Sequence, residues 1–166
     1  TVAFDQSTDG TYAGNMSGSG MLEKSGDGTV TLSGTNTFSG GTTVNGGTLA
    51  GSTDSLQGSI NNNGTVRFDQ SSDGTYSGAM SGTGSLEKNG SGNVNLGGAN
   101  TYSGSTTVNN GTLTLSSSLT SAVVTINSGG TLKGAVALGD LTVNSGGRLS
   151  PELSGSGLTV EDTIFQ

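Results

Sequence analysis

The sequence predicts an all-β fold, a solenoid of about eight turns in which short parallel strands stack on one another. The main reason is a recurring phrase: a strand with a β-branched residue, then Asn and Gly, then a second strand with an aliphatic residue. Its copies are TVNGGTL at 43–49, SINNNGTV at 59–66, TVNNGTL at 107–113, TINSGGTL at 125–132 and TVNSGGRL at 142–149. The interval from Val44 to Ile60 nearly equals that from Ile126 to Val143, and its length is typical of one turn of a coil.

Composition favours a narrow core. Only 28% of the 166 residues are hydrophobic and 32 are Gly, so a broad globular core is not expected. Gly, Ser, Thr and Asn are poor helix formers, and no stretch shows apolar residues at helical spacing. A parallel coil explains this composition, because each turn adds few apolar side chains and its corners suit Gly and Asn. A sandwich of tandem hairpins is the alternative, since NG and GG also mark hairpin turns.

An internal duplication identifies the side chains expected to face inward. Thr1–Leu49 and Thr65–Leu113 align without a gap at an offset of 64, and 34 of the 49 pairs are identical. Matched apolar residues alternate with substituted polar ones, which is the period of a strand with one inward face. The expected inward pairs are Val2/Val66, Phe4/Phe68, Tyr12/Tyr76, Met16/Met80, Leu22/Leu86, Val30/Val94, Leu32/Leu96, Phe38/Tyr102, Val44/Val108 and Leu49/Leu113. The offset of 64 residues divides into about three turns of roughly 21 residues.

The chain is expected to form one coil (1–166) with four parts: a first repeat (1–49), a linking turn (50–64), a second repeat (65–113) and a part with shorter turns (114–166). In the last part VTI at 124–126 and LTV at 141–143 and at 158–160 recur at one constant interval, which predicts that these strands stack. Four aliphatic residues are expected to fill the core between them: Leu119, Val123, Leu138 and Leu153. Pro151 lacks an amide donor and is expected at a corner or strand edge.

Charge and missing residue types exclude several functions. The net charge of −7 is opposed by no basic patch, which disfavours nucleic acid and anionic lipid as partners. The chain has no Cys and no His, so disulfides, thiolate metal sites and a Ser/His/Asp hydrolase site are excluded. No apolar run is long enough to span a bilayer. The first residues begin inside a repeat, which suggests an excised fragment whose end turns expose strand edges and associate end to end.

Duplicated charged residues suggest two further functions, and both are set aside. The Glu-Lys steps at 23–24 and 87–88 resemble part of a carboxylate site, but we interpret them as a surface charge ladder. The segments 5–9 and 69–73 have the Asp-x-Ser-x-Asp spacing that opens a calcium loop. Met16 and Met80 stand where that loop needs a bidentate Glu, so these Asp residues are expected to cap turns instead.

Glycine, threonine and aromatic segments are also interpreted as structural. GSG at 18–20 and GTG at 82–84 lack the rest of a phosphate loop and are expected at corners. The Thr pairs at 42–43 and 106–107 are expected on solvated strand surface rather than on an ice-binding face. The aromatic residues are expected inside the coil or at corners, rather than on a sugar-binding platform. They are Phe4, Tyr12, Phe38, Phe68, Tyr76, Tyr102 and Phe165.

Two long segments resemble a known family. GSGMLEKSGDGTVTLSGTNTFSGGTTVNGGTL at Gly18–Leu49 and GTGSLEKNGSGNVNLGGANTYSGSTTVNNGTL at Gly82–Leu113 closely resemble the passenger-associated transport repeat of autotransporters, the type V secreted proteins of Gram-negative bacteria. SAVVTINSGGTLKG and LTVNSGGRLSP look like the turns that follow such repeats. The resemblance implies a right-handed single-stranded parallel β-helix, exported through the periplasm and an outer-membrane β-barrel. It also implies a role in efficient secretion.

The expected function is therefore that of a structural stalk segment in a secreted or surface-displayed passenger, which assists secretion and folding outside the cell. The alternative is an adhesion or self-association module that binds other cells, a host receptor or a glycan through polar faces of Asn, Thr and Ser. No enzymatic activity, catalytic residue, cofactor or metal is expected. The expected partner is the protein's own C-terminal β-barrel translocator, which is not in this sequence, and the expected location is the cell surface or the extracellular space.

Overall fold

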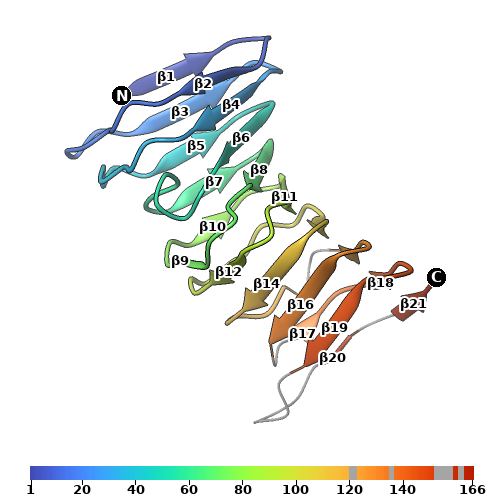
Figure 1. Ribbon diagram of the computed structural model, residues 1–166. Coiled ribbons are helices and arrows are strands. Elements are labelled where there is room, and N and C mark those ends of the chain that lie inside the picture. Colours follow the sequence, from blue (N-terminus) through green and yellow to red (C-terminus); the bar gives the residue numbers. More distant parts are fainter. Residues whose placement is uncertain (120–122, 135–136, 152–158, 161–162) are drawn as a thin grey trace.

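The computed structural model describes residues 1–119, 123–134, 137–151, 159–160 and 163–166, and every regular element in these ranges is a β-strand. The strands stack along one axis, with the two termini at opposite ends of the stack (Figure 1). All strand pairs are parallel, and the chain forms a solenoid of about eight turns. The predicted parallel β-helix is therefore confirmed, and the hairpin sandwich is wrong. Within the described ranges no helix is long and apolar enough to cross a membrane.

Three sheets form the sides of the coil. The first sheet contains β1 (Val2–Asp5), β3 (Leu22–Ser25), β5 (Thr42–Val44), β7 (Ile60–Asn62) and β10 (Met80–Ser81). The second contains β2 (Gly10–Tyr12), β4 (Thr29–Leu32), β6 (Thr48–Gly51), β8 (Thr65–Phe68), β11 (Ser85–Lys88), β13 (Thr106–Val108), β15 (Val124–Ile126), β18 (Leu141–Val143) and β21 (Thr163–Phe165). The third contains β9 (Gly74–Tyr76), β12 (Asn93–Leu96), β14 (Gly111–Leu115), β16 (Gly130–Gly134) and β19 (Arg148–Pro151). A separate pair joins β17 (Ala137–Leu138) to β20 (Thr159–Val160).

The two repeats lie on different sides of the coil. β1 and β3 belong to the first sheet, but their equivalents in the second repeat, β8 and β11, belong to the second sheet. On the first sheet Val2 pairs with Leu22, Leu22 with Thr42, and Thr42 with Ile60, so three full turns already end at Ile60. The chain then passes one further corner before it reaches Val66, the equivalent of Val2. The offset between the repeats is thus three turns plus one side, and the prediction that three longer turns fill it is wrong.

The turns shorten from Thr106 to Leu141, as predicted, but the last turn, from Leu141 to Thr163, is longer and its strands pair differently. Along the second sheet Thr106 pairs with Val124 and Val124 with Leu141, the equivalent residue of the next phrase. The strand after this on the same sheet is β21, in which Thr163 pairs with Leu141, whereas Thr159–Val160 pair with β17. The predicted stacking of the third LTV copy is therefore wrong for its described residues, and Leu158 lies outside them. Pro151 ends β19, an edge strand, as predicted.

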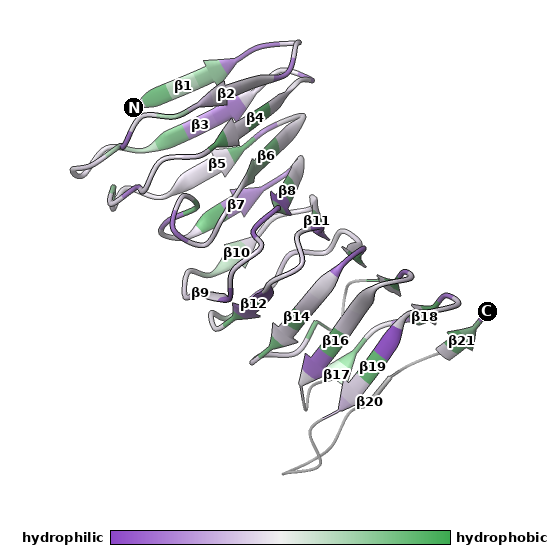
Figure 2. Ribbon diagram, in the orientation of Figure 1, coloured by the Kyte–Doolittle hydropathy of each residue, from purple (hydrophilic) through white to green (hydrophobic). Residues whose placement is uncertain are grey.

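The core is a narrow column of apolar side chains, because residues along each strand alternate between inward and outward positions. Hydrophobic and hydrophilic residues follow one another along β16 and β19 in Figure 2. The predicted inward pairs are buried, apart from three members in the first turn: Val2 is 43% exposed, and Phe4 and Tyr12 are partly buried. Those three residues have a neighbouring turn on one side only.

Two of the four aliphatic residues predicted to fill the C-terminal core do so. Leu119 and Leu138 are buried and form a bridge between their turns. Val123 is 48% exposed, so its prediction is wrong. It directly precedes Val124, which points inward, and adjacent strand residues face opposite ways. Leu153 lies outside the described residues.

Candidate functional site

The duplicated Glu-Lys steps place their two charges on opposite faces of a strand. In β3 Leu22 and Lys24 point inward and Glu23 points outward, and β11 repeats this pattern with Leu86, Glu87 and Lys88. Both lysines are fully buried. The predicted surface ladder is therefore wrong for the lysines. The strand alternation starting from the inward leucine is the signal that could have revealed their position.

Each buried ammonium group lies against backbone carbonyl groups at a corner of the coil. Lys24 Nζ donates hydrogen bonds to the carbonyl oxygens of Ser25 (2.7 Å), Gly26 (2.7 Å) and Gly46 (3.1 Å). Lys88 Nζ donates to the carbonyl oxygens of Gly90 and Asn110, the latter at 3.1 Å. Residues 26 and 90, and residues 46 and 110, are equivalent positions of the two repeats, so the same corner is built twice.

The aliphatic stem of each lysine is part of an apolar layer. Lys24 pairs with Phe4 in the preceding turn and with Val44 in the following one, and Lys88 lies likewise between Phe68 and Val108. Burial lowers the pKa of both lysines because it removes water from the charged form. Asp27 and Asp5 act in the opposite direction on the pKa of Lys24. Asp69 and Asp73 do so for Lys88.

Two of the duplicated aspartates, Asp9 and Asp73, cap the following turn, as predicted. Asp9 Oδ1 accepts a hydrogen bond from the amide of Thr29 at 2.7 Å, and Asp73 Oδ1 accepts one from the amide of Asn93 at 2.7 Å. In the described residues no group of three acidic side chains is placed to hold a metal ion. Of the acidic side chains of the former calcium candidate, Asp9 and Asp73 thus bond to the chain's own backbone, whereas Asp69 Oδ2 accepts a hydrogen bond from the Arg67 side chain.

Buried asparagines form a second duplicated contact that sequence reasoning missed. Asn36 Oδ1 accepts from the amide of Met16 at 2.8 Å, while its Nδ2 donates to the carbonyl of Ser55 at 2.7 Å. Asn100, the equivalent residue, accepts from the amide of Met80 at 3.1 Å. Each amide therefore connects successive turns. The retained NT in GTNTFSG and GANTYSG is the sequence signal for this contact.

A ladder of asparagine side chains runs along one corner, as expected when equivalent residues stack. Asn109 Nδ2 donates to Asn89 Oδ1 at 2.7 Å, Asn127 Nδ2 to Asn109 Oδ1 at 2.6 Å, and Asn144 Nδ2 to Asn127 Oδ1 at 2.6 Å. These four residues are called the asparagine ladder below. All three hydrogen bonds point the same way along the axis.

Most aromatic residues pack inside, as predicted. Phe4 and Tyr12 form an edge-on contact with ring centroids 5.5 Å apart, and their copies Phe68 and Tyr76 pack at 5.7 Å. Phe165 is 73% exposed, so its predicted inward position is wrong.

The glycine and threonine segments are partly as predicted. Gly18 and Gly82 have φ angles of 95° and 102°, which suits the predicted corners. Thr106 is buried, and its Oγ1 lies 2.6 Å from the Tyr102 hydroxyl. The inward threonine of each pair was therefore wrongly predicted on the surface, whereas Thr43 and Thr107 face outward.

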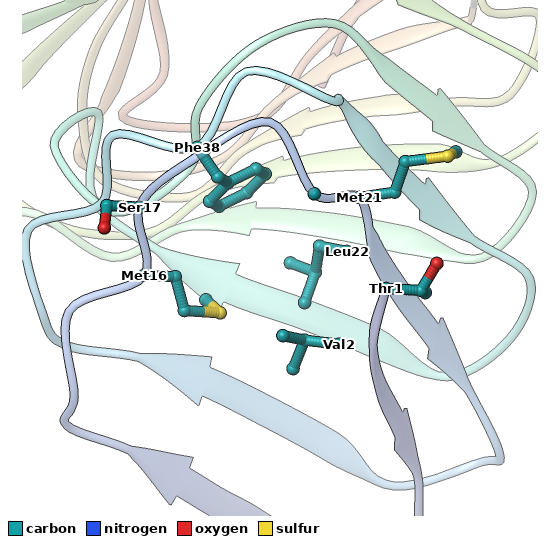
Figure 3. Close-up of a pocket in the computed structure, with 8 residues that line it drawn as sticks. Thr1, Val2, Met16, Ser17, Met21, Leu22 and Phe38 are labelled. Carbon is teal, nitrogen blue, oxygen red and sulfur yellow. The ribbon is translucent and has the colours of Figure 1, made fainter.

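A small apolar hollow lies at the first turn of the coil. It has a volume of about 90 Å³ and is lined by the side chains of Met16, Leu22 and Phe38 together with Val2 and Met21. Figure 3 shows the Met16, Phe38, Leu22 and Val2 side chains grouped together in this hollow. It is the uncovered top of the core column, because the same side chains continue the buried cluster below.

Comparison with known proteins identifies the duplicated segments. A family model described as the passenger-associated-transport-repeat matches residues 22–50 and 86–115. Searches of curated proteins and of solved structures found no match. The two matched segments contain both lysine corners, the corners of the coil at which Lys24 and Lys88 donate to backbone carbonyl groups. They run from β3 to β6 and from β11 to β14.

Proposed function

We propose that this chain, which carries two passenger-associated transport repeats of autotransporter passengers, is a stalk segment that assists outer-membrane secretion by folding outside the cell. The repeats imply a linked translocator and a secreted or surface location in a Gram-negative bacterium.

One observation supports it most directly: each matched repeat contains both partners of its own strand ladders. In the first repeat β3 pairs with β5 and β4 with β6. In the second, β11 pairs with β13 and β12 with β14. A repeat therefore spans parts of two consecutive turns whose strands pair with one another, the smallest unit in which every strand has a neighbour. Such a unit can form as soon as its own residues are outside, and a folded unit opposes return through the barrel.

The polar contacts of the repeats support the same role. Lys24, Asp9 and Asn36 and their copies all bond to the chain's own backbone, and in the described residues every buried side-chain nitrogen or oxygen has a hydrogen-bond partner. The duplicated polar groups are thus used to join turns. Their hydrogen-bonding atoms are therefore already paired within the chain rather than with an external ligand.

Export of the full passenger tests the proposal. We compare the natural passenger with one that lacks Thr65–Leu113 and with one in which residues 65–113 are replaced by residues 1–49. The replacement has the same length and retains a complete repeat. We expect surface-exposed protein to fall in the deletion and to be retained in the replacement, with equal barrel levels in all three.

A further deletion separates loss of the repeat from loss of register. Removal of residues 66–105 takes out two turns but keeps the second sheet in register, since Val66 pairs with Leu86 and Leu86 with Thr106. Unchanged export in both deletions would contradict the proposal. Unchanged export together with loss of cell aggregation or adhesion would favour the alternative function, an adhesion module.

A further inference from the structure

We propose that the lysine corner of each repeat is a carbonyl-lined cation site, that the chain fills it with its own ammonium group, and that this contact fastens the two turns of the repeat together. The inference concerns the isolated coil and does not depend on a role in export. The site is built from the groups around Lys24 Nζ and Lys88 Nζ.

The first argument is that the contact joins two successive turns. Lys24 lies in β3, and its Nζ reaches the carbonyl of Gly46, 22 residues further along the chain. Lys88 reaches the carbonyl of Asn110 over the same interval. In both repeats the lysine and its distant partner fall inside the segment that matches the family model. The contact therefore closes the two-turn unit from within.

The second argument is the nature of the partners. One ion pair occurs within the described residues, and it joins Arg67 to Asp69. Neither buried lysine therefore has a carboxylate at salt-bridge distance. Carbonyl oxygens carry partial negative charge and satisfy an ammonium group without a counterion. A buried ammonium group with no such partners would be strongly unfavourable. The convergence of carbonyl groups on Nζ is therefore what permits lysine at this position.

The third argument is that the corner is shaped around the cation. Gly47 has a φ of 59°, and a Cβ atom built on it would lie 2.8 Å from Lys24 Nζ and 2.5 Å from the carbonyl oxygen of Gly26. Its copy Gly111 has a φ of 70° and meets the carbonyl oxygen of Gly90 at 2.5 Å. Glycine at these positions leaves room for the carbonyl groups to approach the ammonium group.

Amine acylation tests whether the site is closed. The chain has three lysines, at 24, 88 and 133, and Lys133 is exposed on β16. Treatment of the folded chain with an amine-acylating reagent, followed by mass spectrometry of peptides, should modify Lys133 readily. We expect acylation of Lys24 and Lys88 to be slower by about tenfold or more, because it requires local opening. Equal rates at all three lysines would overturn the inference.

Substitution tests whether the ammonium group fastens the turns. Lys88→Met keeps an unbranched apolar stem and removes the charge, and Lys133→Met is the matched exposed control. We expect Lys88→Met to lower the urea midpoint and Lys133→Met to leave it unchanged. If Lys88→Met does not fold, Lys88→Gln, whose amide can still donate to a carbonyl, should fold with a midpoint below that of the natural chain. A natural or raised midpoint in either Lys88 variant would overturn the inference.

Discussion

Removal of one amide from the asparagine ladder gives a prediction whose size follows from its geometry. Asn127 takes part in two of the three ladder bonds, at 2.6 Å to Asn109 and 2.6 Å from Asn144. Asn144 takes part in only one of them. A protein hydrogen bond contributes about 0.5–1.5 kcal/mol to stability. Asn127→Ala should therefore lower the free energy of unfolding by about 1–3 kcal/mol, and Asn144→Ala by about half as much.

Urea unfolding followed by far-ultraviolet circular dichroism measures both variants, since the signal reports on strands and the chain has no Trp. The midpoints should fall in the order natural, Asn144→Ala, Asn127→Ala, with an unchanged slope. The order depends on the number of bonds lost, because both side chains are partly exposed at equivalent corners. Equal losses in the two variants would refute the view that the ladder acts through its side-chain bonds, and so would no loss in either.

Three further predictions concern a corner, an ionisable side chain and the register. Gly111→Ala should destabilise the chain by more than about 1 kcal/mol in urea, because φ is 70° and the new Cβ meets the carbonyl of Gly90. Burial raises the pKa of Tyr102, so the folded state keeps a proton that the unfolded state releases near pH 10. The free energy of unfolding should therefore fall as pH rises above about 10. Urea midpoints measured across pH should fall less steeply in Tyr102→Phe. Thr48 and Thr65 are partners in neighbouring strands, so Thr48→Cys with Thr65→Cys should form a disulfide on oxidation; a coil with both repeats on the same side would keep these residues apart.

The fold was predictable because its signal is repeated and local. Alternation within strands and near-constant intervals between phrases suffice to predict parallel stacking, and stacking in turn predicts the asparagine ladder. That Asp9 and Asp73 cap backbone was also predictable, since short polar side chains next to Gly commonly bond to backbone amides. The amides they cap, those of Thr29 and Asn93, lie one turn further along and were not predicted.

The lysine corner was missed because its carbonyl groups converge only in the folded coil. A charged residue beside Glu23 is ordinarily exposed, and an inward Lys24 becomes favourable where the corner at Ser25 and Gly26 meets the carbonyl of Gly46 in the next turn. Alternation from Leu22 gave the direction of the side chain, but not a reason for a cation to be there. The partners of Asn36 are equally remote, at Met16 and Ser55.

The rotation between the repeats shows what the duplication preserves. An alignment without gaps suggests that equivalent residues share a side of the rod, yet β3 and β11 lie on different sheets, so Glu23 and Glu87 face different directions. A partner that lies along one side would therefore meet non-equivalent surfaces of the two repeats. The copies share internal contacts: the lysine corner, the buried asparagine and the Phe-Tyr pair. Outward positions are mixed: Thr31 and Asn95 differ, whereas Glu23 and Glu87 are identical. Because even identical outward residues face different directions in the two copies, the rotation supports a repeat retained for the way it folds rather than for one continuous surface.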